Sequence, residues 1–139
     1  MRATVIPAPQ PVLLDVEGET EQFPVRRVYC VGRNYADHAI EMGHDPSREP
    51  PFFFQKNADN LYHGDTFPYP PVSSDVHFEV ELVMALSGGG ADIPVEEALS
   101  KVYGYGIGID FTRRDVQDKA KKMSRPWESA KAFEHSAPV

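Results

Sequence analysis

The sequence predicts an α+β fold that is mainly β. Segments with the composition of β-strands outnumber segments with helical periodicity, and turns rich in Pro, Gly, Ser and Asp separate them. The helical segments are short and have clear terminal signals. The 139 residues suffice for one hydrophobic core, and the chain has no internal repeat or low-complexity segment. We therefore expect one main domain, residues 25–139, after an N-terminal arm or small β unit in residues 1–24.

The first half of the main domain is expected to contain short strands and one helix. Residues 26–32 (RRVYCVG) are β-rich and end in a glycine, which is typical of a strand followed by a turn. Residues 34–42 follow as a helix with suitable residues at both ends. Residues 52–56 (FFFQK) form another strand. The turn-rich residues 64–75 then lead into a strand over 77–86.

The second half is expected to contain two helices with a strand between them. Residues 93–104 carry proline near the first helical position, acidic residues in the first turn and glycine at the end. The glycine-rich stretch 103–110 predicts a strand whose backbone is approached closely by another group. The second helix covers 112–123, with Thr112 and Asp115 in a capping-box pattern. The remaining C-terminal residues are expected to be extended.

Composition and charge exclude several classes of partner. The chain has 14 basic and 21 acidic residues, a formal net charge of −7, which argues against nucleic acid or an anionic membrane. No stretch approaches the roughly 18 apolar residues of a membrane span, and the N-terminus lacks the pattern of a secretory signal. The single cysteine, Cys30, has no partner for an internal disulfide, as expected of a cytoplasmic protein.

The strand over 77–86 (HFEVELVMAL) carries Glu79 and Glu81 on one face, because side chains alternate along a strand. Two like charges side by side are unfavourable unless a cation neutralises them, and Mg²⁺, Mn²⁺ and Ca²⁺ prefer oxygen ligands. A solvated strand face is the alternative explanation. The opposite face is an apolar row that we expect to face the core: Phe78, Val80, Leu82, Met84 and Leu86.

Asp110 is a third candidate metal ligand. It ends the apolar, glycine-rich strand and directly precedes a helix, a position from which functional side chains often project. Capping of that helix is the alternative role, although Thr112 competes for it. Three acidic residues from two strand ends would suit one metal ion with open positions for substrate and water.

Two further sets of residues are candidates for catalysis and substrate binding. His38 and Glu41 lie three apart on the expected helix 34–42, so they share a face and can act together as a general base. Basic and amide groups that could bind a carboxylate or an oxyanion lie next to turns or helix starts. Surface ion pairs are the alternative for both sets. The basic and amide candidates are Arg33, Arg114, Gln117 and Lys131.

Five separated blocks carry a family resemblance from about residue 25 to the end of the chain. In chain order they are VYCVGRNYADHAIEMG, PPFFFQK, HFEVELVMAL, GYGIGIDFTRRDVQ and RPWESAKAFEHSAPV. Together they resemble the fumarylacetoacetate hydrolase family, and within it the small acylpyruvate-hydrolase branch, which includes fumarylpyruvate hydrolases. The resemblance implies a mixed β-sheet rolled into a barrel-like structure with short helices, of which residues 25–139 would be the N-terminal part. It also implies a homodimer with Mg²⁺ or Mn²⁺ at its centre.

The resemblance assigns roles to the candidate residues. It implies that a 2,4-dioxo acid such as fumarylpyruvate chelates the metal, that activated water attacks the distal carbonyl, and that a metal-bound pyruvate enolate departs. Oxaloacetate decarboxylation on the same metal site is the alternative reaction. The implied roles are metal binding by Glu79, Glu81 and Asp110, water activation by His38 and Glu41, enolate stabilisation by Lys131, and substrate binding by Arg33, Arg114 and Gln117.

The chain is shorter than the family domain, which continues well past Val139. The resemblance therefore predicts a C-terminally shortened chain, in which part of the sheet lacks its partners and exposed edges favour aggregation. A third hypothesis follows from this length: an inactive fragment with only a binding or structural role.

Overall fold

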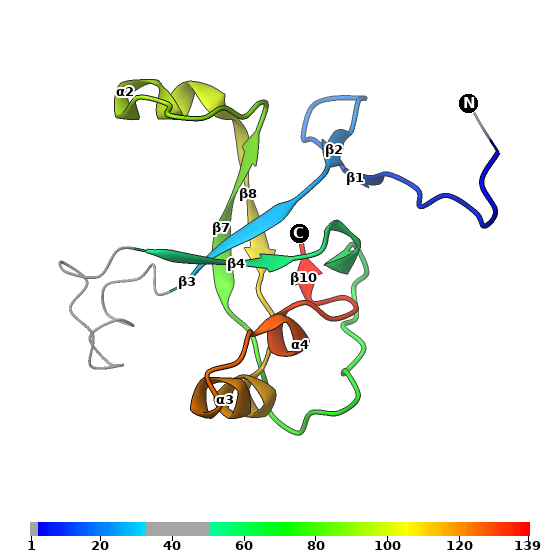
Figure 1. Ribbon diagram of the computed structural model, residues 1–139. Helices are drawn as coiled ribbons and strands as arrows, with labels where there is room; N and C mark the ends of the chain where they lie inside the picture. The colour runs from blue at the N-terminus through cyan, green and yellow to red at the C-terminus, as the bar shows by residue number, and fades with distance from the viewer. Residues whose placement is uncertain (1–2, 33–50) are drawn as a thin grey trace. The chain divides into compact units, whose positions relative to one another are not determined.

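The computed structural model describes residues 3–32 and 51–139. The chain divides into two compact units, Met1–Asp59 and Asn60–Val139. Short strands dominate both units and the helices are few and short (Figure 1), so the predicted α+β, mainly β class is confirmed. The domain division predicted after residue 24 stays a prediction. No helix in the described ranges is long and apolar enough to cross a membrane.

The first unit contains two antiparallel strand pairs. Strand β1 (Val12–Leu14) pairs with β2 (Phe23–Val25), and β3 (Val28–Gly32) pairs with β4 (Phe52–Lys56). The last two strands match the segments that the sequence predicted. The expected helix over 34–42 lies outside the described residues. A short 3-10 helix, η1 (Ala58–Asn60), follows β4.

The second unit is built around a long antiparallel hairpin. Strand β7 (Val80–Leu86) pairs with β8 (Val102–Ile109), and the connection between them contains α2 (Val95–Ala98) and a 3-10 turn, η2 (Leu99–Lys101). In Figure 1, α2 lies at one end of this hairpin and the helices that follow β8 lie at the other end. The strands predicted over 77–86 and 103–110 are present, although β7 begins only at Val80. The helical segment predicted between them is also present but is shorter than expected.

Short elements surround the base of the hairpin. Strand β6 (Val76–His77) pairs antiparallel with β9 (Thr112–Arg113), and β5 (Leu61–Tyr62) pairs parallel with β10 (Ala137–Pro138). Helix α3 (Arg114–Lys122) follows β9 directly, and α4 (Glu128–Lys131) follows α3. The expectation of an extended C-terminal region is wrong for α4, since a helical turn forms there before the chain becomes extended again at β10.

The core of the second unit lies where α3, α4, β9 and β10 meet. Its buried apolar side chains are small apart from one phenylalanine, and two hydroxyl side chains are fully buried among them. The apolar members are Ala120, Ala130, Phe133 and Ala137, and the hydroxyl members are Thr112 and Ser136.

The apolar row of β7 does not face this core, which corrects the sequence-based expectation. Its side chains, with Phe78 just before the strand, are 55–71% exposed, and the apolar side chains on the same face of β8 are 53–74% exposed. The reason is that β7 and β8 form a two-stranded sheet, and no layer of the described second unit covers this face. The row consists of Phe78, Val80, Leu82, Met84 and Leu86, joined by Tyr103, Tyr105 and Ile107.

Candidate functional site

The hairpin register brings the three candidate metal ligands onto one face. Glu79, just before β7, and Asp110, just after β8, exchange backbone hydrogen bonds with N···O distances of 3.2 Å and 2.8 Å. Within the strands, Glu81 stands opposite Gly108. Directly opposed residues project to the same side of a sheet, as do residues two apart. Glu79, Glu81 and Asp110 therefore project from the same face of the hairpin base.

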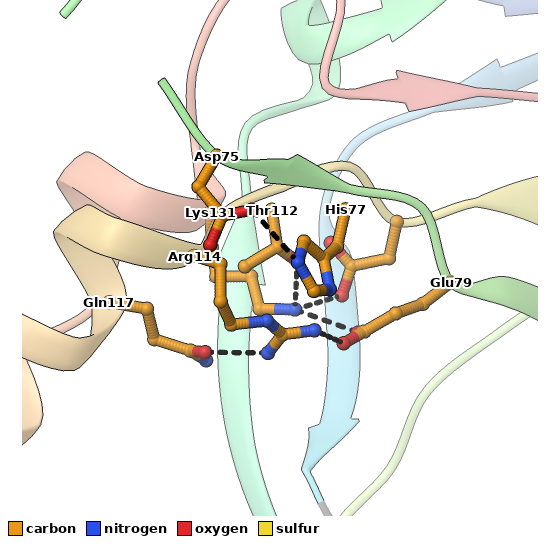
Figure 2. A network of polar contacts seen from close by, with 8 residues as sticks. Asp75, His77, Glu79, Thr112, Arg114, Gln117 and Lys131 are labelled. Atoms are coloured by element: carbon orange, nitrogen blue, oxygen red, sulfur yellow. Dashed lines mark hydrogen bonds and ion pairs between the residues drawn. The ribbon is translucent and has the colours of Figure 1, made fainter. Parts of the chain in front are cut away.

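Lys131 joins two of these carboxylates. It comes from the last turn of α4, and its side chain is only 3% exposed. Its Nζ donates to Oδ2 of Asp110 at 2.7 Å, to Oε2 of Glu79 at 2.9 Å and to Oγ1 of Thr112 at 2.6 Å (Figure 2). An ammonium group has three N–H donors, and these contacts offer it two carboxylates and one hydroxyl as acceptors.

Arg114 and Gln117 extend the network from α3. One terminal nitrogen of Arg114 donates to Oε1 of Glu79 at 2.6 Å, and the other donates to the side-chain oxygen of Gln117 at 2.7 Å. Figure 2 shows the guanidinium group lying between these two partners. The shared helix face predicted from their spacing is therefore present. Gln117 is buried, at 3% exposure.

The charges of this network control the ionisation of Glu79. Burial raises the pKa of its carboxyl group, but the ammonium of Lys131 and the guanidinium of Arg114 outweigh burial and bring the pKa down to about 2 from an ordinary value of 4.5. Two carboxylates, Glu79 and Asp110, are thus balanced by two cations.

The backbone around Lys131 is fixed by a buried serine. Ser136 donates its hydroxyl to the carbonyl oxygen of Lys131 at 3.0 Å, and its own carbonyl accepts the N–H of Phe111 at 3.0 Å. Ser136 therefore links the end of α4 to the residue that follows Asp110. Through this link, Ser136 holds the segment that carries Lys131 next to the segment that carries Asp110.

The start of α3 is set by a loop and not by the predicted capping box. Asp115 accepts hydrogen bonds from the Ser73 hydroxyl at 2.7 Å and the Ser74 N–H at 3.2 Å, which lower the pKa of its carboxyl group. The N–H of Arg114 donates to the carbonyl of Asp75 at 2.7 Å. The capping-box prediction is wrong because the helix begins two residues later than expected and no side chain caps it.

Thr112 also belongs to this site, although the sequence pattern predicted that it would cap a helix. It is fully buried, and its hydroxyl accepts a hydrogen bond from Lys131 where a helix cap was expected. Its position two residues after Asp110, on the same side of an extended segment, was the available signal. That signal was ambiguous, because threonine before an Asp or Glu also marks a helix start.

The donor set suits a hard divalent cation. Glu79 and Asp110 already direct one oxygen each at a single cationic group, and Glu81 projects from the same face. Oxygen-only ligands of this kind favour Mg²⁺, Mn²⁺ or Ca²⁺ over softer metals. Within residues 3–32 and 51–139, however, no three His, Cys, Asp or Glu side chains converge closely enough to enclose an ion. Of the other predicted site residues, Arg33, His38 and Glu41 lie outside the described residues.

Comparison with known proteins identifies the family. The family model described as fumarylacetoacetate (FAA) hydrolase, C-terminal, matches residues 27–139. A crystal structure of fumarylpyruvate hydrolase from Pseudomonas aeruginosa, in complex with Mn²⁺ and pyruvate, is 52% identical to this chain with a TM-score of 0.91. The match covers 98% of this chain and 60% of that chain.

Curated relatives carry other activities in their names. An oxaloacetate tautomerase of Escherichia coli is 37% identical over 123 residues, which cover 88% of this chain and 56% of the relative. A mitochondrial oxaloacetate decarboxylase of Dictyostelium discoideum is 39% identical over 115 residues, covering 82% of this chain and 53% of the relative. The chain thus spans about half the length of these relatives. On the family match and the shared fold, the chain belongs to the fumarylacetoacetate hydrolase family and resembles its fumarylpyruvate hydrolases.

Proposed function

We propose that the chain belongs to a metal-dependent hydrolase that cleaves a carbon–carbon bond in acylpyruvates, with fumarylpyruvate as the preferred substrate. The observation that carries this proposal is the convergence of two carboxylates, Glu79 and Asp110, on one buried cationic group. The fumarylpyruvate hydrolase of Pseudomonas aeruginosa, which is 52% identical, was crystallised with Mn²⁺ and pyruvate, and pyruvate is a product of the proposed reaction.

Glu79, Glu81 and Asp110 would hold the metal ion, Mg²⁺ or Mn²⁺. When bound, such an ion supplies Lewis-acid polarisation of substrate oxygens. The side chains of the chain itself account for the other requirements. Lys131 and Arg114 lower the pKa of Glu79 and so favour its ionised form, which is the form that binds a cation.

The proposed reaction needs a base for water and a cation for the leaving group. His38 and Glu41 would take a proton from water, which adds to the distal carbonyl carbon. The bond between that carbon and the pyruvate methylene then breaks, and its electron pair passes to the departing enolate. Lys131 would stabilise the negative charge on the enolate oxygen. Protonation of the enolate carbon gives pyruvate, and the acyl group leaves as a carboxylic acid, fumarate for fumarylpyruvate.

Arg114 and Gln117 would orient the substrate. A guanidinium has five N–H donors, so Arg114 can contact a substrate carboxylate while it still bonds to a protein group. Arg33, which is outside the described residues, stays a predicted substrate-binding residue. The homodimer and the cytoplasmic location expected from the sequence stay predictions alongside these roles.

The test is release of pyruvate from fumarylpyruvate, measured by coupling to lactate dehydrogenase. We expect turnover by the 139-residue chain to require Mn²⁺ or Mg²⁺, to stop with chelator and to fall about 100-fold or more in Asp110→Asn. The exposed Lys122→Met variant serves as the control and should retain full activity. Turnover that is indifferent to chelator would contradict the proposal, and a folded chain without any turnover would support the inactive-fragment hypothesis.

Oxaloacetate chemistry is the second candidate function, favoured by the names of the curated relatives. Decarboxylation of oxaloacetate also forms an enolate but needs no attack by water. The variant His38→Ala should therefore abolish cleavage of fumarylpyruvate while retaining part of any oxaloacetate decarboxylation. Equal loss of both activities would mean that the two reactions share the same base.

A further inference from the structure

We propose that the ammonium group of Lys131 is a tethered cation that competes with the divalent metal for Glu79 and Asp110, and so sets the metal affinity of the site. This inference rests on the proposed function, since it assumes that these carboxylates bind a metal ion. It adds a role for Lys131 in the metal-free protein, before substrate or metal arrives.

The ammonium group of Lys131 contacts two of the three carboxylates that would hold a metal ion. Its Nζ lies 2.7 Å from an oxygen of Asp110 and 2.9 Å from an oxygen of Glu79. Divalent cations bind carboxylate oxygens at about 2.0–2.6 Å. An ion on the same two oxygens would therefore lie within a few ångströms of the positive charge of Lys131, whose side chain is only 3% exposed.

The low exposure of Lys131 strengthens the repulsion between its ammonium group and a bound metal ion. Charges on a protein surface are screened by water and salt, whereas buried charges are screened much less. A metal can bind without this repulsion only if the ammonium moves to other acceptors. The lysine side chain is long and flexible enough to do so, because four carbon–carbon bonds separate the charge from the backbone.

Thr112 holds the ammonium group in place. Its Oγ1 is the third acceptor of the Nζ group at 2.6 Å, and the residue is fully buried. Unlike the two carboxylates, Thr112 carries no charge, so it does not itself attract a metal strongly. Its contact thus favours the lysine-bound state of the site over the metal-bound state. We assign Thr112 as a positioning residue for Lys131.

The competition has a benefit for the metal-free chain. Two adjacent carboxylates that are largely buried would repel each other and would raise the free energy of the folded state. Lys131 removes this cost, so the second unit can fold before metal binds. The same contact then opposes metal binding, which makes the metal affinity lower than three carboxylates alone would give.

The test compares Mn²⁺ dissociation constants, measured by electron paramagnetic resonance of free Mn²⁺, for the 139-residue chain and three variants. Lys131→Met should bind Mn²⁺ about tenfold or more tightly, because the competing charge is gone. Thr112→Val, which keeps the shape and the lysine charge, should bind Mn²⁺ several-fold more tightly. Lys122→Met changes the net charge equally but lies exposed on α3, and should bind Mn²⁺ as the parent does.

Folding is checked separately by circular dichroism in chelator. If Lys131→Met does not fold without metal, Thr112→Val decides the question alone, because it retains all four charges of the network. Mn²⁺ binding to Thr112→Val that is as weak as in the parent, or weaker, would overturn the inference.

Asp110→Asn separates this inference from the proposed function. If Asp110→Asn binds Mn²⁺ as well as the parent, the metal site itself is misplaced and the proposed function fails with it. If Asp110→Asn loses binding while Lys131→Met and Thr112→Val bind no tighter than the parent, the metal site stands and only the competition by Lys131 is refuted.

Discussion

At the scale of single residues, Glu79 shows how the site keeps a carboxylate ionised although it is mostly covered. Its side chain is 25% exposed and each of its two oxygens bonds to a different cation, Oε1 to Arg114 and Oε2 to Lys131. Charge-assisted bonds of this kind are stronger than bonds between neutral groups. Glu79 therefore links the helix α3 to the helix α4 through its two oxygens.

The low pKa of Glu79 predicts a specific dependence of stability on pH in the metal-free chain. A carboxyl group whose pKa is about 2 when folded and 4.5 ordinarily adds stability above pH 4.5 and loses it as the pH falls towards 2. We expect the parent chain, in chelator, to lose on the order of 1–2 kcal/mol more than Glu79→Gln between pH 6 and pH 3. Urea unfolding at both pH values measures this. Equal losses in the two proteins would show that Glu79 is not held by its cations.

The residue types of the site could be recognised from the sequence, but their pairing could not. Glu79 and Glu81 were visible as like charges two apart, and Asp110 as an acid at the end of an apolar strand. Nothing local indicates that Lys131, more than fifty residues from Glu79, donates to it, and that role was inferred only from the family resemblance. Thr112 was missed because its local pattern also describes a helix start.

At the scale of elements, the glycines of β8 differ in how much free space surrounds them. A methyl group at Gly108 would lie 2.8 Å from Cγ2 of Val83 and 3.3 Å from the carbonyl oxygen of Pro138 in β10. A methyl group at Gly104 would meet nothing within 4 Å. The close approach that the sequence predicted for this strand is therefore real at Gly108, where β10 crosses it, and absent at Gly104.

This difference predicts opposite effects for two identical substitutions. Gly108→Ala should destabilise the second unit by about 1–3 kcal/mol, because Val83 is stiff and the Pro138 carbonyl belongs to the backbone. Gly104→Ala should be neutral or stabilise by up to about 1 kcal/mol, because alanine loses less backbone entropy than glycine in a strand. Urea unfolding followed by the fluorescence of Trp127 measures both. Similar effects of the two changes would argue against the contact between β8 and β10.

Element boundaries were less predictable than the elements themselves. The strand over 103–110 and the helix after Asp110 follow from local patterns. The register that sets Glu79 against Asp110 depends on how two distant strands pair, which periodicity does not encode. The helical turn α4 was missed because it is four residues long, too short to show helical periodicity.

At the scale of the whole molecule, the chain combines a well-packed site with an uncovered sheet face. Asp110, Thr112, Gln117 and Lys131 are buried in the second unit, whereas the apolar row of β7 and β8 is more than half exposed. The chain covers 60% of the solved fumarylpyruvate hydrolase that it matches. The sequence predicted the strand and its apolar face correctly, but burial of that face is a property of the whole assembly of layers and cannot be read from alternation alone.

This arrangement predicts where truncation of a large apolar side chain is harmless in the 139-residue chain. Leu82 is 66% exposed, so Leu82→Ala should lower the free energy of unfolding by less than about 1 kcal/mol, since little apolar area returns to water. Phe133 is 6% exposed and packs beneath the guanidinium of Arg113, so Phe133→Ala should cost about 3–5 kcal/mol. Urea unfolding followed by Trp127 fluorescence compares them. A loss of several kcal/mol in Leu82→Ala would mean that the apolar row is covered in solution, because only a buried leucine leaves a cavity when it is truncated.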